Sequence, residues 1–94
     1  MDNKQVKKVF VRMVDKFVSI STQYDAGLAT ETQLKKCACD QLAVCLRLKE
    51  VETLRMDTLV NGWLDIIKAD RDALEIPINK VCGELYTLIN QAEE

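Results

Sequence analysis

The fold is decided by residues 30–69, which read TETQLKKCACDQLAVCLRLKEVETLRMDTLVNGWLDIIKA. Glycine is absent between Gly27 and Gly62, and the one proline of the chain is Pro77, so little in this stretch opposes a helix. At about 100° per residue its apolar residues share one broad face. That face consists of Leu34, Cys37, Ala38, Cys45, Leu48, Met56, Leu59, Trp63, Ile66 and Ile67. The phase is kept throughout, which predicts one long, bent helix over residues 31–69.

A break in this helix is the alternative. The apolar face is interrupted once, at Lys49 and Glu52. Asn61-Gly62 is a second weak point, because glycine costs a helix interior about 1 kcal/mol relative to alanine. Asp57 is also suited to cap a new helix. If the chain breaks between Glu52 and Gly62, the same residues form a four-helix bundle.

A shorter helix is predicted on each side of the central stretch. A coiled-coil-like seam with alternating spacings of four and three residues predicts the first, over residues 3–24. The seam consists of Val6, Phe10, Met13, Phe17, Ile20 and Tyr24. Gly27 suits the position after this helix, and Thr30 with Gln33 predicts a capping box at the start of the next. Pro77 fits a first helical turn, which predicts the last helix over residues 77–91.

These elements predict a single all-α domain over residues 1–94 with three main helices. The first helix is expected to pack on the first half of the central helix, and the last helix on its second half. Apolar residues make up 48% of the chain and aromatic residues only 5%, so the core should be aliphatic, with Trp63 inside it.

The charge is unevenly distributed, although the formal net charge is only −2. Residues 1–29 carry +2, residues 30–56 carry +1 and residues 57–94 carry −5. No run of eighteen apolar residues exists to span a membrane, and the N-terminus lacks the apolar core of a signal peptide. The four cysteines read as small core hydrophobes, which suits a reducing compartment. We therefore expect a cytoplasmic protein.

The residues that catalysis usually needs are missing. The chain contains no histidine, which is the commonest general base and a common metal ligand. Cys37-Ala38-Cys39 has the wrong spacing for a zinc knuckle, and the three glycines are too far apart for a phosphate loop. Carboxylates two residues apart, such as Asp70 and Asp72, diverge on a helix. We expect a protein that is not an enzyme and that uses no cofactor or metal.

The first helix has more apolar surface than one packing face requires, because valines widen its apolar arc to about 200°, where little over 100° is usual. Exposed apolar patches mark protein–protein contacts. The residues left without a place in the core are Val11, Val14, Val18, Val51 and Leu54. They predict a small noncatalytic protein–protein interaction module, of the adaptor or inhibitor type, that docks apolar helix surface on a partner.

Self-association is a related prediction. An unbroken central helix would be about 60 Å long, and two shorter helices could not cover it. A homodimer is the commonest arrangement that would cover the remaining apolar surface.

A nucleic-acid-binding protein is the alternative function. The first helix carries a basic stripe that could follow a phosphate backbone, formed by Lys4, Lys8, Arg12 and Lys16. The sequence pI of about 5.2 is low for such a protein. Membrane binding is not expected, because valines rather than bulky anchors accompany these cations.

Overall fold

The computed structural model describes the backbone of residues 3–51 and 56–92 and the side chains of residues 4–48 and 56–91. Its elements are α1 (Asn3–Asp25), α2 (Glu31–Val51), α3 (Asp57–Lys68), the short 3-10 helix η1 (Arg71–Ala73) and α4 (Glu75–Ala92). No strand occurs in these residues, so the all-α prediction is confirmed. The radius of gyration is 13.0 Å, as expected for a folded domain of about 100 residues.

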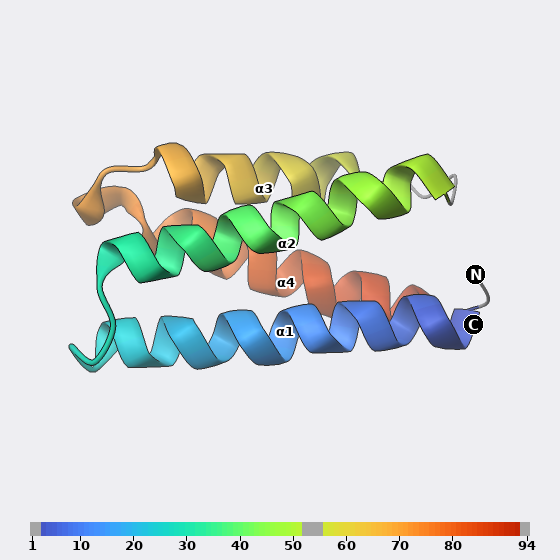
Figure 1. Ribbon diagram of the computed structural model, residues 1–94, viewed down its shortest axis with the longest axis horizontal. Helices are drawn as coiled ribbons and strands as arrows, with labels where there is room; N and C mark the ends of the chain where they lie inside the picture. Colours follow the sequence, from blue (N-terminus) through green and yellow to red (C-terminus); the bar gives the residue numbers. More distant parts are fainter. Residues whose placement is uncertain (1–2, 52–55, 93–94) are drawn as a thin grey trace.

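The helices form an up-down-up-down bundle (Figure 1). Helix α1 packs against α2 and α4, and α3 packs against the same two helices, so α1 and α3 lie diagonally opposite each other. The α1–α2 connection and η1 lie at one end of the bundle, which we call the loop end. The predicted contacts of the first helix with the first half of the central stretch, and of the last helix with its second half, are both present.

The prediction of one unbroken central helix was wrong, and the four-helix alternative is confirmed. Helix α2 ends at Val51, α3 begins at Asp57, and the two pack side by side in opposite directions. The residue that precedes α3 is Met56, which is 1% exposed and makes no side-chain cap, so Asp57 is the first helical residue rather than the cap. Folding back lets the two halves of the continuous apolar face cover each other, which a straight helix cannot do.

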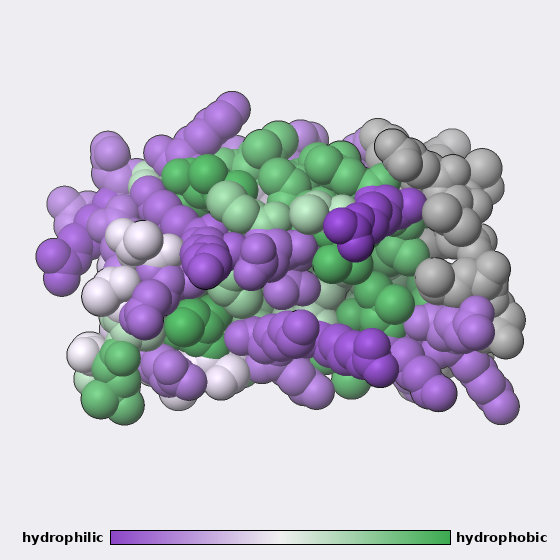
Figure 2. Space-filling model, viewed as in Figure 1, coloured by the Kyte–Doolittle hydropathy of each residue, from purple (hydrophilic) through white to green (hydrophobic). Residues whose placement is uncertain are grey.

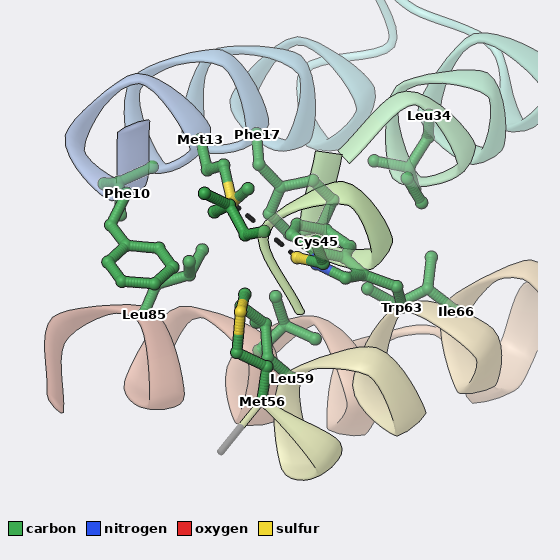
Figure 3. Close-up of a cluster of buried hydrophobic side chains, with 14 of the residues drawn as sticks. Phe10, Met13, Phe17, Leu34, Cys45, Met56, Leu59, Trp63, Ile66 and Leu85 are labelled. Atoms are coloured by element: carbon green, nitrogen blue, oxygen red, sulfur yellow. Dashed lines mark hydrogen bonds between the residues drawn. The ribbon is translucent and has the colours of Figure 1, made fainter. Parts of the chain in front are cut away.

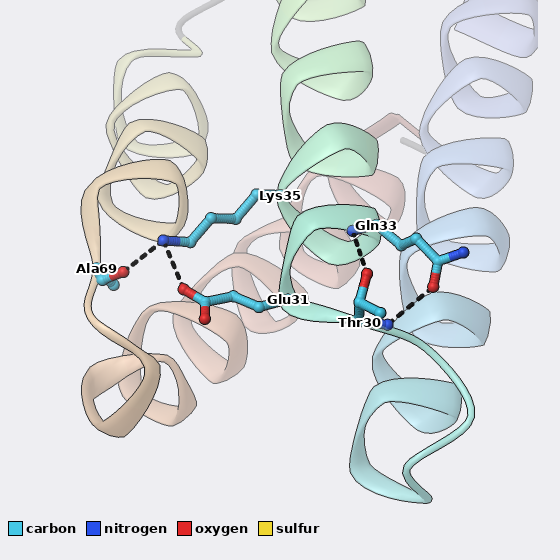
Figure 4. A network of polar contacts seen from close by, with 5 residues as sticks. All are labelled: Thr30, Glu31, Gln33, Lys35 and Ala69. Carbon is cyan, nitrogen blue, oxygen red and sulfur yellow. Dashed lines mark hydrogen bonds and ion pairs between the residues drawn. The ribbon is translucent and has the colours of Figure 1, made fainter.

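The connection between α1 and α2 follows the predicted signals closely. Gly27 adopts a φ of +76°, which L side chains rarely adopt, and its N–H donates to the carbonyl of Tyr24 at 3.1 Å. The N–H of Leu28 donates to the carbonyl of Gln23 at 2.8 Å, which completes a Schellman motif. The capping box is also confirmed (Figure 4): Thr30 N–H donates to Gln33 Oε1 at 2.8 Å, and Gln33 N–H donates to Thr30 Oγ1 at 3.1 Å.

The start of α4 differs slightly from its prediction. The helix begins at Glu75, so Pro77 occupies the third helical position. An N–H at this position has no acceptor within the helix, so the proline costs no hydrogen bond there. The first helix ends at Asp25, one residue beyond the prediction.

The core contains the predicted apolar faces (Figure 3). Phe17 of α1 and Trp63 of α3 are fully buried and meet edge to face, with ring centroids 4.8 Å apart, so they connect the diagonal pair of helices. Gly62 marks the closest approach of α3 and α4, because a Cβ at this position would lie 2.5 Å from Val81 Cγ2. One polar residue that the sequence did not place in the core is buried there. It is Gln41, whose Nε2 donates to Cys37 Sγ at 3.9 Å.

Candidate protein-interaction surfaces

The structure divides the valines that were predicted to form an interface. Val14 is only 8% exposed and belongs to the core, so its assignment to an interface was wrong. It lies one helical turn beyond Phe10 and next to Met13, on the side of α1 that the bundle covers. Val11 and Val18 are 37% and 38% exposed, and their seven-residue spacing places them on one side of α1. The side chain of Val51, and Leu54, lie outside the described residues.

The cations predicted for nucleic-acid binding are all exposed on α1. Lys4, Lys8 and Arg12 surround a hollow of about 430 Å³ with Val11 in its wall. Among the described residues none of these three cations forms an ion pair. Lys16 lies one turn further along α1 and does not line this hollow. We refer to Lys4, Lys8, Val11 and Arg12 as the α1 surface.

A second apolar area, which the sequence did not predict, lies where α2 meets α3. Leu46 is 46% exposed, and partly exposed aliphatic side chains accompany it on both helices. Figure 2 shows hydrophobic side chains gathered along this edge of the bundle, above a band of hydrophilic side chains over α1. The residues on the adjoining sides of the two helices are Leu42, Leu46, Val60, Leu64 and Ile67, and we refer to them as the α2–α3 patch. The spacings of four and seven residues that place them there were visible in the sequence, but only the reversal of direction after Val51 brings the two rows together.

A polar groove occupies the loop end of the bundle. Two adjacent hollows of about 430 and 530 Å³ share Tyr24, Asp25 and Arg71. The first of them is also lined by two further carboxylates, Asp72 and Glu75, and by two apolar side chains, Leu74 just before α4 and Ile78 within it. We refer to this region as the loop-end groove.

Lys35 fixes the loop end from the side of α2 (Figure 4). Its Nζ lies 2.9 Å from a carboxylate oxygen of Glu31 and donates to the carbonyl of Ala69, the residue that caps the end of α3, at 2.7 Å. A lysine at the C-terminus of a helix also interacts favourably with the helix dipole. The start of α2 and the end of α3 are thereby held together beside the groove.

Three of the four cysteines have thiols that the fold keeps protonated. Burial raises the pKa of Cys45 to about 11, and raises the pKa of Cys37 and of Cys82 from its ordinary value. The Cys45 thiol donates to Met13 Sδ at 3.9 Å (Figure 3). The indole N–H of Trp63 partly opposes the shift at Cys45, although no hydrogen bond of good geometry joins the two groups. Nucleophilic cysteines need a lowered pKa, so the buried Cys45 is suited to packing rather than to attack.

Cys39 differs from the other cysteines because it is exposed, which agrees with its absence from the predicted apolar face. All four thiols are free. Within residues 3–51 and 56–92, no three side chains of the histidine, cysteine or carboxylate kind are placed to hold a metal ion. No described helix is both long and apolar enough to cross a membrane.

Comparisons with protein-family models, curated proteins and solved structures found no match for this chain.

Proposed function

We propose that this chain is a noncatalytic protein-interaction module that binds an amphipathic helix of a partner protein on the α2–α3 patch. The exposure of Leu46 beside four partly exposed aliphatic residues is the observation that carries the proposal. Exposed apolar patches are typical of protein–protein interaction sites. The function is the one predicted from the sequence, but the surface is a different one.

The arrangement of the patch suits a helix as the ligand. Two antiparallel helices provide its two sides, with Leu42 and Leu46 on α2 and Val60, Leu64 and Ile67 on α3. A third helix with apolar residues at spacings of three and four would pack along them, as helices do in hydrophobic grooves. Burying a whole leucine contributes about 1.5–3 kcal/mol, so the 46% of Leu46 that is still exposed offers about 1 kcal/mol.

The experiment is position-specific crosslinking in an extract of the native host. A photo-reactive amino acid is introduced at Leu46 or Leu64 and, for comparison, at Val11 or Val18. We expect one partner protein to crosslink from both positions of the patch, and the exposed substitution Leu46→Glu to abolish the crosslink at Leu64. Crosslinks that arise only from Val11 and Val18 would move the interface to α1, and crosslinks from none of the four positions would refute the proposal.

Nucleic-acid binding remains the second candidate, because Lys4, Lys8 and Arg12 are exposed and unpaired among the described residues. Val11 lies among these cations, and Lys16 does not line the hollow that they share, so three of the four predicted cations support this candidate. Fluorescence anisotropy with labelled duplex and single-stranded DNA and RNA tests it directly. A binding constant that falls steeply with salt, and that Lys8→Gln with Arg12→Gln weakens, would support this candidate.

A further inference from the structure

Two regions of opposite charge contain exposed side chains that form no ion pair within the described residues. On the α1 surface, Lys4, Lys8 and Arg12 make no ion pair with any described residue. At the loop-end groove, three exposed carboxylates likewise make no ion pair with any described residue. The first hollow of the groove has one cation in its lining, Arg71, so that lining carries a net charge of −2. The carboxylates are Asp25, Asp72 and Glu75.

These two regions cannot neutralise each other within one molecule. Lys8 and Asp25 lie near opposite ends of the straight helix α1, which separates them by about 25 Å at 1.5 Å per residue. Salt screens charges beyond about 8–10 Å at physiological ionic strength. The opposite charges therefore meet only if the groove of another molecule comes to the α1 surface.

We infer that the protein associates head to tail, with the α1 surface of one copy docked in the loop-end groove of the next. Lys8 and Arg12 are one helical turn apart, so their side chains project together toward the same partner. In the groove they meet Asp25 and Asp72, while Val11 faces the partly exposed side chain of Ile78.

A contact between two different surfaces has a consequence that a two-fold dimer lacks. Each copy keeps one free α1 surface and one free groove, so association continues into short chains or closes into a ring. The dimer predicted from the sequence rested on a long helix that its neighbours could not cover. That reason no longer applies, because α2 and α3 cover each other. The association inferred here depends on charge and weakens as salt is added.

Two neutralising variants test the pairing. In the first, Lys8→Gln with Arg12→Gln disables the α1 surface and leaves the groove intact. In the second, Asp25→Asn with Asp72→Asn disables the groove and leaves the α1 surface intact. Neutralisation is used rather than reversal, so that the two variants cannot form a new attraction of opposite sign. All four side chains are exposed, so circular dichroism should show the helix content of the unmodified protein in both variants.

The mass is measured by sedimentation equilibrium at low and high salt. The unmodified protein should exceed its monomer mass of 10.7 kDa at low salt, increasingly with concentration, and return to it at high salt. Each variant alone should stay monomeric. An equal mixture of the two should form a pair of twice the monomer mass and nothing larger, because only one intact α1 surface and one intact groove remain for each pair.

Control variants and contrary results are equally specific. Lys36→Gln with Lys80→Gln removes the same charge from other exposed positions and should leave the association unchanged. The pairing would be overturned if the control variant associated no more strongly than the first variant. It would also be overturned if the unmodified protein were monomeric at low salt. A two-fold dimer lost on Val18→Asp, or a mixture that stays monomeric, would also overturn it. None of these results affects the proposed function, because the crosslinks at Leu46 and Leu64 lie on the α2–α3 patch.

Discussion

Replacing Gly62 by alanine tests how closely α3 and α4 approach each other. The added Cβ would lie 2.5 Å from Val81 Cγ2, whereas apolar atoms in contact are about 3.5–4.0 Å apart. Val81 is 1% exposed, and its β-branched side chain has few other rotamers in a helix. The overlap of about 1 Å must therefore be relieved by moving the two helices apart or by forcing Val81 out of its rotamer.

Two opposing effects set the magnitude of the change in stability. Alanine is favoured over glycine in a helix interior by about 1 kcal/mol. Overpacking a tight core costs about 1–3 kcal/mol. Because the overlap involves a stiff, fully buried side chain, we expect overpacking to prevail and the free energy of unfolding to fall by about 1 kcal/mol. That loss corresponds to a decrease in Tm of about 4–8 °C for a domain of this size.

Urea unfolding followed by far-ultraviolet circular dichroism measures the effect, and the chain supplies a matched control. Gly83 also lies within a helix, but it is exposed and a Cβ there would meet no atom within 4 Å. Gly83→Ala should therefore stabilise the protein by about 0.4–1 kcal/mol. Gly62→Ala should cost less stability in a Val81→Ala background than in the unmodified protein, since that background lacks the overlapping methyl group. Stabilisation by Gly62→Ala as large as that by Gly83→Ala would contradict the close approach of the two helices.

Three further predictions follow from features of α1, α2 and the core. Thr30→Ala removes one half of the capping box and should lower the free energy of unfolding by about 1 kcal/mol in the same urea assay, with no change in the folded circular dichroism spectrum. Val14→Asp places a charge in the core and should abolish cooperative thermal unfolding, whereas Val18→Asp at the 38% exposed position should change Tm little. Equal Tm values for the two variants would contradict the assignment of Val14 to the core. The Cys45 pKa of about 11 lies above the thiol's ordinary 9.0, so the folded state favours the neutral thiol. The contribution of this thiol to the free energy of unfolding is therefore complete below pH 9 and is lost as the pH rises to 11. Urea midpoints measured across this range should fall more steeply for the unmodified protein than for Cys45→Ala, and parallel curves would refute the shift.

Local signals in the sequence were sufficient to predict most of the fold. The seam from Val6 to Tyr24 is buried or half-buried throughout, and the capping box of Thr30 and Gln33 has the expected hydrogen bonds. Such patterns depend on helix geometry and on backbone groups only a few residues apart, so they can be read without knowing the tertiary structure. The break after Val51 could not be read in this way. Two antiparallel helices that bury adjoining faces keep a continuous apolar phase by coincidence, and only their packing distinguishes them from one long helix.

The candidate surfaces were harder to predict because they depend on which faces become neighbours. Val14 and Val18 are the same residue type on the same helix. Val14 nevertheless lies in the core, whereas Val18 is exposed. Their difference is decided by which side of α1 the neighbouring helices cover, and the sequence of α1 alone does not contain that information. Leu46 and Leu64 are eighteen positions apart and form one patch only because α2 and α3 run in opposite directions. Charge was easier to interpret, since the acidic excess of residues 57–94 did contribute two of the carboxylates of the loop-end groove.

The edge-to-face contact between Phe17 and Trp63 also gives this protein a built-in optical reporter. Trp63 is the single tryptophan of the chain, it is fully buried, and it belongs to the diagonal pair of helices whose separation would open the core. Its fluorescence should therefore be blue-shifted in the folded state and should move to longer wavelength as water reaches the indole. The emission of one side chain thus follows the integrity of a centre to which all four helices contribute, with no label and no change to the surface.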